Sequence, residues 1–381
     1  MSAQVGFGRG LITPELPVVL AGFGARKGAV HEVRHDLEAH ALVVRDGGQT
    51  LCLLVLDLLM LAPDHADPVR AAVSAALGIP ASQVLTSCTH THSGPSAAAG
   101  TRRAGWPPPD GYLERLTAGC VDAATTAQAG AEPAAFAYAR APLPEGLSLN
   151  RRDLPYDPEF AVLEVRRPDG SRIGTVTNVG IHPVALGITC RAVSGDWVTT
   201  FRERSQKATG APSILLPGAL GDVNPGRDPH THPDPAGNWD TAEELGADVA
   251  SAVDDLLPEV QPSGDRAGVV ARREVTLRAG VTLASVLGGV ALRPVEVELF
   301  EWDLGGIRLV SVPGEAFHAL GRAMERARGD RTLLAGLAPV WHGYLPAPFR
   351  SGYEETMSYG RGFVHPLREL LVTPPEPQAR L

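Results

Sequence analysis

The sequence predicts an α/β fold of the mixed α+β type, with a large mixed β-sheet core flanked by helices. Strand-like apolar runs dominate the first half of the 381-residue chain, helical patterns lie between some of them, and no repeat is visible. With 44% hydrophobic and 20% charged residues, the chain can bury a full core. At roughly 100–200 residues per domain the length fits one large or two ordinary domains, and we expect a single domain over residues 1–381.

The predicted elements follow in chain order. Strands are expected at residues 41–45, 51–56, 83–88, 137–139, 160–165, 173–179, 295–302 and 307–312. Helices are expected at residues 68–77, 112–129, 238–257 and 315–328. The first helix places Val69, Val73 and Leu77 on one face, and Pro258 ends the third. Three stretches rich in Gly, Pro or charge predict long loops, at residues 94–110, 224–237 and 341–362.

Composition excludes several classes of protein. The net charge of -9 and the pI near 5.7 argue against nucleic-acid binding, which needs a basic footprint. The longest apolar run, residues 51–62, is interrupted by an aspartate and is too short to span a bilayer. No secretion signal is expected at the N-terminus. The four cysteines form no Cys-x-x-Cys pair, so we expect buried free thiols, no cysteine zinc site and a cytoplasmic protein.

Residues 85–95 carry the most informative motif. A short apolar strand runs directly into His90 and His92, and the chain then breaks at Ser-Gly-Pro. In an extended chain residues i and i+2 project on the same face, so both imidazoles should point into one space. Neutral imidazole is the commonest protein metal ligand and is easily tuned for proton transfer. The alternative is two strand-end histidines hydrogen-bonded in a loop.

Four further segments also place a polar residue at the turn after an apolar strand. They end in His182, in Asp222 with Asn224, in Glu315 and in Tyr344. Glu315 is expected in the first turn of a helix, where the helix dipole alone would favour it. Two histidines, a carboxylate and a tyrosine suit zinc, with three ligands, a weak fourth and room for water or substrate.

The ordered motifs resemble the signature of the neutral (non-lysosomal) ceramidase family, and the likeness runs from about residue 5 to residue 360. The matching motifs are Thr-His-Thr-His-Ser-Gly-Pro at 89–95, Gly-Ile-His-Pro at 180–183, Gly-Asp-Val-Asn-Pro at 221–225, Pro-Gly-Glu at 313–315 and Gly-Tyr at 343–344. Leu-Asn-Arg at 149–151 resembles the family's Asn-Arg element, and Asp57 ends a strand where the family also has an aspartate.

This resemblance implies a neutral-ceramidase-like catalytic domain with one zinc ion per chain. It implies the zinc ligands His90, His182, Glu315 and Tyr344. His92 would lie beside the metal, and Arg151 and Tyr353 would lie near the substrate amide. The chain departs from the family at Asn224, where the family has a serine important for activity. We also expect no C-terminal β-sandwich domain, because the chain is much shorter than a ceramidase.

The retained residues suit hydrolysis by a zinc-activated water without a covalent intermediate. His92 is the expected proton shuttle, and Tyr344 would bind the metal weakly or donate to the oxyanion. Arg151 would orient a polar or anionic group of the substrate. Asn224 can hydrogen-bond a carbonyl or oxyanion through its amide. Asp222 is either an acceptor for a ligand histidine, which we favour, or a general base.

Three other polar positions have simpler explanations. Asp196 resembles another turn of the family, but we favour an N-cap for a helix that begins near Trp197. Ser194 has no partner histidine that the sequence reveals. His230 and His232 could bind a second metal or line the mouth of the site, and we favour an exposed loop without metal.

The expected function is that of a zinc-dependent hydrolase that cleaves the carbon–nitrogen bond of a small-molecule or lipid-like amide, or else an ester or lactone. One alternative is a ceramidase-like amidase that acts on N-acyl sphingoid bases. The other is a non-catalytic relative that keeps zinc for structure or ligand binding. Ligand type alone does not exclude another divalent metal.

Overall fold

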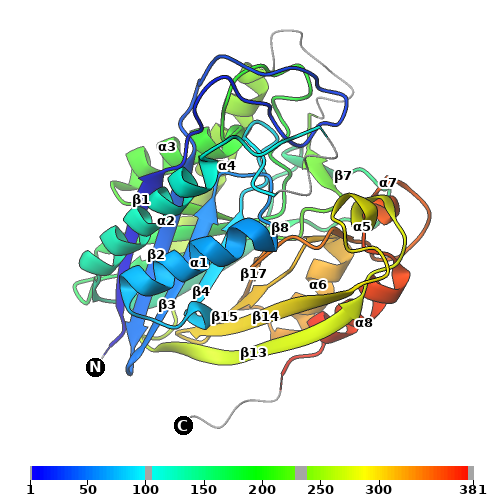
Figure 1. The fold of residues 1–381 in the computed structure, drawn as a ribbon. Helices are drawn as coiled ribbons and strands as arrows, with labels where there is room; N and C mark the ends of the chain where they lie inside the picture. The colour runs from blue at the N-terminus through cyan, green and yellow to red at the C-terminus, as the bar shows by residue number, and fades with distance from the viewer. Residues whose placement is uncertain (1, 99–104, 228–237, 376–381) are drawn as a thin grey trace.

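Two five-stranded mixed sheets stack face to face and form the centre of the molecule (Figure 1). The computed structural model describes residues 2–98, 105–227 and 238–375. The first sheet has the order β4-β3-β2-β1-β5, in which β3 and β4 are parallel and the other pairs antiparallel. Its strands are β1 (Gln4–Leu11), β2 (Glu38–Asp46), β3 (Gln49–Leu56), β4 (Val84–Cys88) and β5 (Glu132–Pro133).

The second sheet repeats this arrangement with the order β10-β9-β8-β6-β12, and again only one pair, β9 with β10, is parallel. Its strands are β6 (Ala135–Pro142), β8 (Glu159–Arg166), β9 (Arg172–Val179), β10 (Ser213–Pro217) and β12 (Gln261–Pro262). Apolar side chains of both sheets meet in one core cluster, which includes Leu53 of β3 and Leu163 of β8. In both sheets a parallel strand ends close to residues of the candidate site.

A third sheet extends this core with the order β13-β14-β15-β17. Its strands are β13 (Ala267–Arg278), β14 (Pro294–Leu304), β15 (Ile307–Ser311) and β17 (Thr332–Ala335). Two short ribbons pair β7 (Ser148–Asn150) with β11 (Val223–Pro225), and β16 (Glu315–Ala316) with β18 (Tyr344–Leu345). The predicted mixed β-sheet core is therefore built from several sheets in the described part of the chain.

Helices cover the outer faces of the sheets (Figure 1). The described helices are α1 (Pro63–Leu77), α2 (Tyr112–Ala129), α3 (Trp197–Thr209), α4 (Trp239–Leu256), α5 (Leu283–Leu287), α6 (His318–Arg328), α7 (Tyr353–Thr356) and α8 (Arg361–Val372). Helices α1 and α2 pack on the first sheet, α3 and α4 on the second, and α6 and α8 on the third. The mixed α/β class predicted from the sequence is confirmed.

The most informative differences from the expected elements are these. Helix α1 begins at Pro63, five residues early, because proline fits the first helical position. The predicted helix over 315–328 begins only at His318, since residue 315 belongs to a strand. The predicted loop at 341–362 contains β18 and α7. Strands β1 and β13 have no counterpart among the predicted elements.

Strand β1 escaped prediction because of its glycines, and the structure shows what they do. A Cβ atom on Gly6 would lie 2.0 Å from the Ala127 oxygen, and one on Gly8 would lie 2.1 Å from the Ala123 oxygen. Gly10 is equally close to Gly119 of the same helix. The alternating glycines therefore let α2 lie directly against β1.

Two further expectations can be compared with the structure. Cys52, Cys88, Cys120 and Cys190 are buried free thiols, as predicted. Among the described helices, none is long and apolar enough to cross a membrane.

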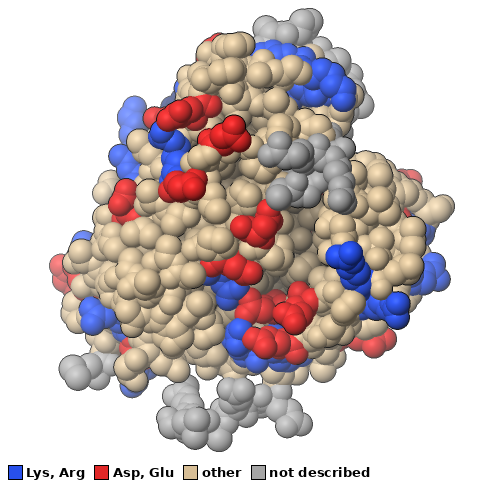
Figure 2. Space-filling view, in the orientation of Figure 1, with Lys and Arg blue, Asp and Glu red and all other residues tan. Residues whose placement is uncertain are grey.

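A surface pocket of about 840 Å³ lies between α1 and the β13–β14 hairpin. Figure 2 shows acidic side chains gathered around a hollow on this face. The arginines of this pocket, Arg70 and Arg272, both pair with Glu298.

Candidate metal centre

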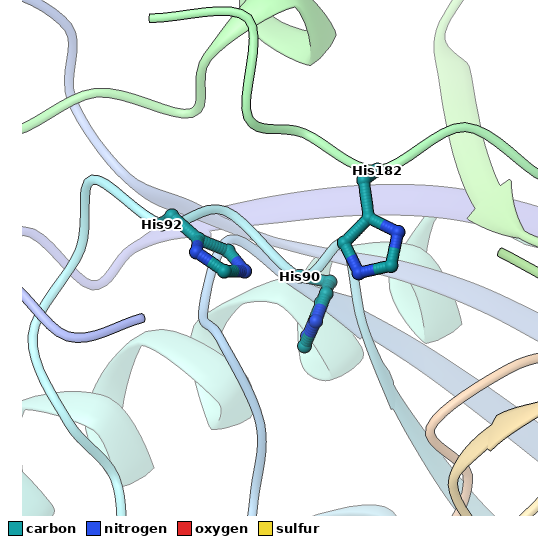
Figure 3. A group of neighbouring side chains, drawn as sticks. All are labelled: His90, His92 and His182. Carbon is teal, nitrogen blue, oxygen red and sulfur yellow. The ribbon is translucent and has the colours of Figure 1, made fainter. Parts of the chain in front are cut away.

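His90 and His92 follow the end of β4, as the sequence predicts, and their ring centroids lie 5.1 Å apart (Figure 3). The backbone between them is not the extended chain that was assumed, because His90 has a φ of +76°. This left-handed conformation is rare for a residue with a side chain and is often found at functional sites. The His90 N–H donates to the Leu58 carbonyl oxygen at 2.9 Å, which fixes the turn.

His182 joins the pair from the turn after β9. Its ring centroid lies 4.9 Å from that of His90 and 6.1 Å from that of His92 (Figure 3). One nitrogen of each imidazole lies within 4.8 Å of the corresponding nitrogens of the other two. The three histidines therefore form a cluster that can hold a metal ion.

Backbone carbonyls fix the tautomers of two of these histidines. Nδ1 of His90 lies 2.6 Å from the Leu59 carbonyl oxygen, and Nδ1 of His182 lies 3.0 Å from the Val223 carbonyl oxygen. A carbonyl oxygen can only accept, so Nδ1 must carry the proton in each ring. Nε2 of each neutral ring therefore presents a lone pair, which is the form that binds a metal.

The Glu315 carboxylate lies against the Nε2 atoms of two of these histidines. Its Oε2 lies 3.3 Å from Nε2 of His90 and 3.3 Å from Nε2 of His182. Burial would raise the pKa of Glu315, but the neighbouring histidines hold it well below its usual value. Burial lowers the pKa of His182 to about 4. Oε2 of Glu315 thus faces both Nε2 atoms, and a cation shared between them, whether a proton or a metal ion, makes this contact favourable.

Glu315 reaches this position through a strand and not through a helix, which corrects the prediction. It lies in β16, whose parallel partner β18 places Tyr344 directly beside it. Trp341 donates from Nε1 to Oε1 of Glu315 at 2.8 Å. Trp341 is not among the site residues predicted from the sequence, although it precedes the Gly-Tyr motif by two residues.

His92 differs from the other two histidines because its two ring nitrogens, although buried, have no hydrogen-bond partner among the described residues. Burial, followed by the fields of His90 and His182, holds the pKa of His92 well below its usual value. The ring packs against Phe23 at a centroid distance of 4.8 Å. His92 is thus placed where it can serve as a third nitrogen ligand or as a proton carrier.

Arg151 and Tyr344 are in contact, but Arg151 is already engaged. The arginine donates to Glu354 Oε1 at 3.1 Å, to Asn224 Oδ1 at 3.2 Å and to the Gly221 carbonyl at 2.6 Å. Its Nη2 also lies 3.4 Å from the Tyr344 hydroxyl oxygen. Burial, and next Glu315, keep the pKa of Tyr344 well above its usual value. Arg151 therefore orients Tyr344 and Asn224 within the protein.

Asp222 does not contact a ligand histidine, so the interpretation that we favoured from the sequence is wrong. Its Oδ1 accepts from the His318 N–H at 2.7 Å, and its Oδ2 accepts from Asn150 at 2.8 Å. Main-chain oxygens of Leu59 and Val223 take the role expected of Asp222. The carboxylate instead caps the start of α6 and holds the turn that contains Val223.

The other predicted positions lie at the edge of the centre or away from it. Tyr353 is 60% exposed, and its ring lies 6.0 Å from that of Tyr344. Asp196 caps α3 by accepting from the Trp197 N–H at 2.8 Å, as predicted. Ser194 does have a histidine partner, since its Oγ lies 2.9 Å from Nδ1 of His35. The histidines at 230 and 232 lie outside the described residues.

Solved structures of ceramidases share this fold. A neutral ceramidase from Pseudomonas aeruginosa matches with a TM-score of 0.85 and 18% sequence identity, over 100% of this chain and 76% of that chain. A ceramidase complexed with C2 matches with a TM-score of 0.83 and 17% identity, over 98% of this chain and 74% of that chain. No model of a protein family matches the sequence, and no curated protein does.

The chain is thus an α/β protein with a buried histidine cluster able to hold a metal ion. Its particular fold is that of the neutral ceramidase catalytic region, matched over the whole chain. This confirms the resemblance inferred from the ordered motifs. At these identities the likeness establishes the fold alone.

Proposed function

We propose that this protein is a metal-dependent hydrolase that cleaves the carbon–nitrogen bond of an amide. One observation carries the proposal: Oε2 of Glu315 faces Nε2 of both His90 and His182 at 3.3 Å. A structural site would be closed by four strong ligands, whereas a catalytic site keeps one position open. Two fixed imidazoles and one carboxylate match the second type.

The residues present fit zinc, because imidazole nitrogen and carboxylate oxygen are among its usual ligands. His90, His182 and Glu315 would hold the ion, with Tyr344 beside them and His92 available as a further nitrogen ligand. Zinc would supply a Lewis acid for the carbonyl group and would lower the pKa of a water molecule to about 7.

The remaining side chains have roles that do not depend on holding the ion. Hydrolysis breaks the carbon–nitrogen bond and leaves the amine with one proton more. His92 is suited to move that proton, because its ring nitrogens have no other partner and its low pKa keeps it neutral. The Tyr344 hydroxyl, oriented by Arg151, can donate to a developing oxyanion.

An amide is proposed because both structural neighbours are ceramidases by name, and ceramide contains an N-acyl bond. A lipid-like amide is the second candidate. Four large apolar side chains around α5 are exposed, namely Val281, Leu283, Val286 and Leu292. The α5 segment bonds to the chain just after α7, since Thr282 Oγ1 donates to the Ser358 oxygen. An acyl chain that leaves the site past Tyr353 would meet this apolar surface.

The test is metal content together with hydrolysis. Elemental analysis of protein purified without added metal should find about one zinc ion per chain in the wild type. His90→Ala and Glu315→Ala should each abolish metal binding and amide hydrolysis. His31→Ala and Glu369→Ala are matched controls, because both residues are exposed and lie outside the cluster. Metal content that is unchanged in both site variants would refute the proposal.

A further inference from the structure

Arg26 is a buried arginine with unused donors, and it lies beside the candidate metal centre. Arg26 is only 5% exposed. Nη2 donates to the Ala21 carbonyl oxygen at 2.7 Å and to the His92 carbonyl oxygen. Nε and Nη1 are buried and have no hydrogen-bond partner. Two of the three guanidinium nitrogens thus have no acceptor among the described residues.

No carboxylate in the described part of the chain forms an ion pair with the Arg26 guanidinium. Asp196 acts on it only from a distance and is occupied by the main-chain N–H groups of Ala185, Leu186 and Trp197. Burial lowers the pKa of Arg26 to about 10, so the guanidinium stays charged at neutral pH. An unpaired buried charge is costly unless a partner is supplied.

The segment that carries Arg26 forms the wall over His92. A Cβ atom on Gly22 would lie 2.4 Å from the His92 ring, so the main chain there touches the imidazole. The Phe23 ring packs on the same imidazole, and the Arg26 guanidinium lies 5.1 Å from the Phe23 ring centroid. The Phe23 ring therefore lies near both the His92 ring and the Arg26 guanidinium, which also donates to the His92 carbonyl oxygen.

Arg26 differs in this respect from the other arginine of the centre. Arg151 already donates to Glu354, Asn224, Gly221 and Tyr344, so little of its hydrogen-bonding capacity remains. The arginines of the pocket beside α1 are also paired, both with Glu298. Beside the candidate metal centre, Arg26 thus has no ion-pair partner among the described residues, whereas Arg151 has one.

We propose that Arg26 binds a carboxylate of the substrate, so that the preferred substrate is an amide with a carboxylate close to its scissile bond, as in N-acyl amino acids. This inference rests on the proposed hydrolase function. The reaction adds one water molecule: the carbon–nitrogen bond breaks, a carbon–oxygen bond forms, and the nitrogen gains a proton. Arg26 takes no part in these steps and acts as a specificity-determining residue.

The experiment compares two ligands that differ in one charge and does not require turnover. The ligands are the ketone analogues of N-octanoylglycine and N-octanoylethanolamine, in which CH2 replaces the amide NH. Isothermal titration of the metal-loaded wild type should give at least about tenfold tighter binding of the carboxylate analogue, as expected for a charge-assisted hydrogen bond. Arg26→Met should remove this preference, and Arg26→Lys should keep part of it.

Arg191→Met is the matched control, because Arg191 is exposed and its charge acts on Arg26 without binding the ligand. It should leave the preference unchanged. Equal binding of both ketones by the wild type would overturn the inference. Equal weakening of both ketones in Arg26→Met would show a structural role and would overturn it as well.

Kinetics separate this inference from the proposed function. In the wild type, N-octanoylglycine should be hydrolysed with a lower KM than N-octanoylethanolamine, and Arg26→Met should raise only the first KM. A preference for the carboxylate ketone without any hydrolysis would contradict the hydrolase and leave the anion site standing. Hydrolysis of N-octanoylethanolamine, together with equal binding of the two ketones, would support the hydrolase and contradict the anion site.

Discussion

Trp341 donates a hydrogen bond of 2.8 Å from Nε1 to Oε1 of Glu315, while Oε2 of the same carboxylate faces the two imidazoles. The indole N–H is a donor only, so it can stabilise the carboxylate but cannot compete with it for a cation. Such a contact fixes which oxygen is presented to the metal.

Replacing Trp341 by phenylalanine should therefore weaken metal binding without removing a ligand. We expect the affinity to fall by about 10–100-fold, the usual effect of losing a partner of a ligand. Competition with a chelating dye would measure the metal affinity of each protein. Trp302→Phe is the matched control, since the Trp302 indole is buried and its Nε1 has no partner. Equal affinity in Trp341→Phe and wild type would contradict the orienting role.

His92→Gln should separate the two roles open to this histidine. If His92 carries a proton, the variant keeps its metal and loses turnover by about 10²–10⁴-fold, the usual contribution of general acid–base catalysis. We expect this result, because in the proposed site Glu315 with His90 and His182 would already supply three ligands. Metal analysis and amide hydrolysis should be measured on the same preparation. Loss of the metal together with activity would identify His92 as a ligand instead.

Asp57 and Arg202 form a buried ion pair that supports the His90–His92 turn. Nη1 of Arg202 lies 2.8 Å from Oδ1 of Asp57, and both residues are at most 3% exposed. Thr89 also donates to Oδ1 of Asp57, at 3.3 Å.

Arg202→Met should lower the free energy of unfolding by about 3–5 kcal/mol, because the aspartate is left buried and unpaired. The double variant Asp57→Asn/Arg202→Met should recover part of this loss. Urea unfolding of the three proteins would test both statements. A double variant that is no more stable than Arg202→Met would rule out the unpaired charge as the cause.

His342 should make the protein sensitive to acid. Burial lowers its pKa from 6.5 to about 4 in the folded state. Between these two values the unfolded chain binds more protons than the folded one, so stability falls as the pH falls through this window.

His342→Phe should reduce the loss of stability between pH 7 and pH 5, because the aromatic cluster with Tyr359 and Phe363 can accept a phenyl ring. The substitution should reduce the change in the free energy of unfolding with pH by at most about 1.4 kcal/mol per pH unit. Urea midpoints at both pH values would measure it, with His31→Ala as a control at an exposed histidine. An unchanged pH dependence in His342→Phe would contradict the explanation.

Local sequence patterns were sufficient for several parts of this molecule. The helix at residues 112–129 was predicted to the residue, because apolar spacing and a terminal glycine are local features. His90, His92 and His182 were found for the same reason, since each follows an apolar strand directly. The N-cap at Asp196 also depends on its immediate neighbours alone.

What the sequence by itself determined is the mixed α/β class and the strand ends at which the polar residues of the centre lie. Tertiary structure alone decided the partners: β18 beside β16, Trp341 on Glu315, Asp222 on α6, and Arg26 against His92. These contacts join segments that are separated in the chain by 26 to 96 residues. Their geometry depends on how sheets and helices pack together, and local propensity carries no information about that packing.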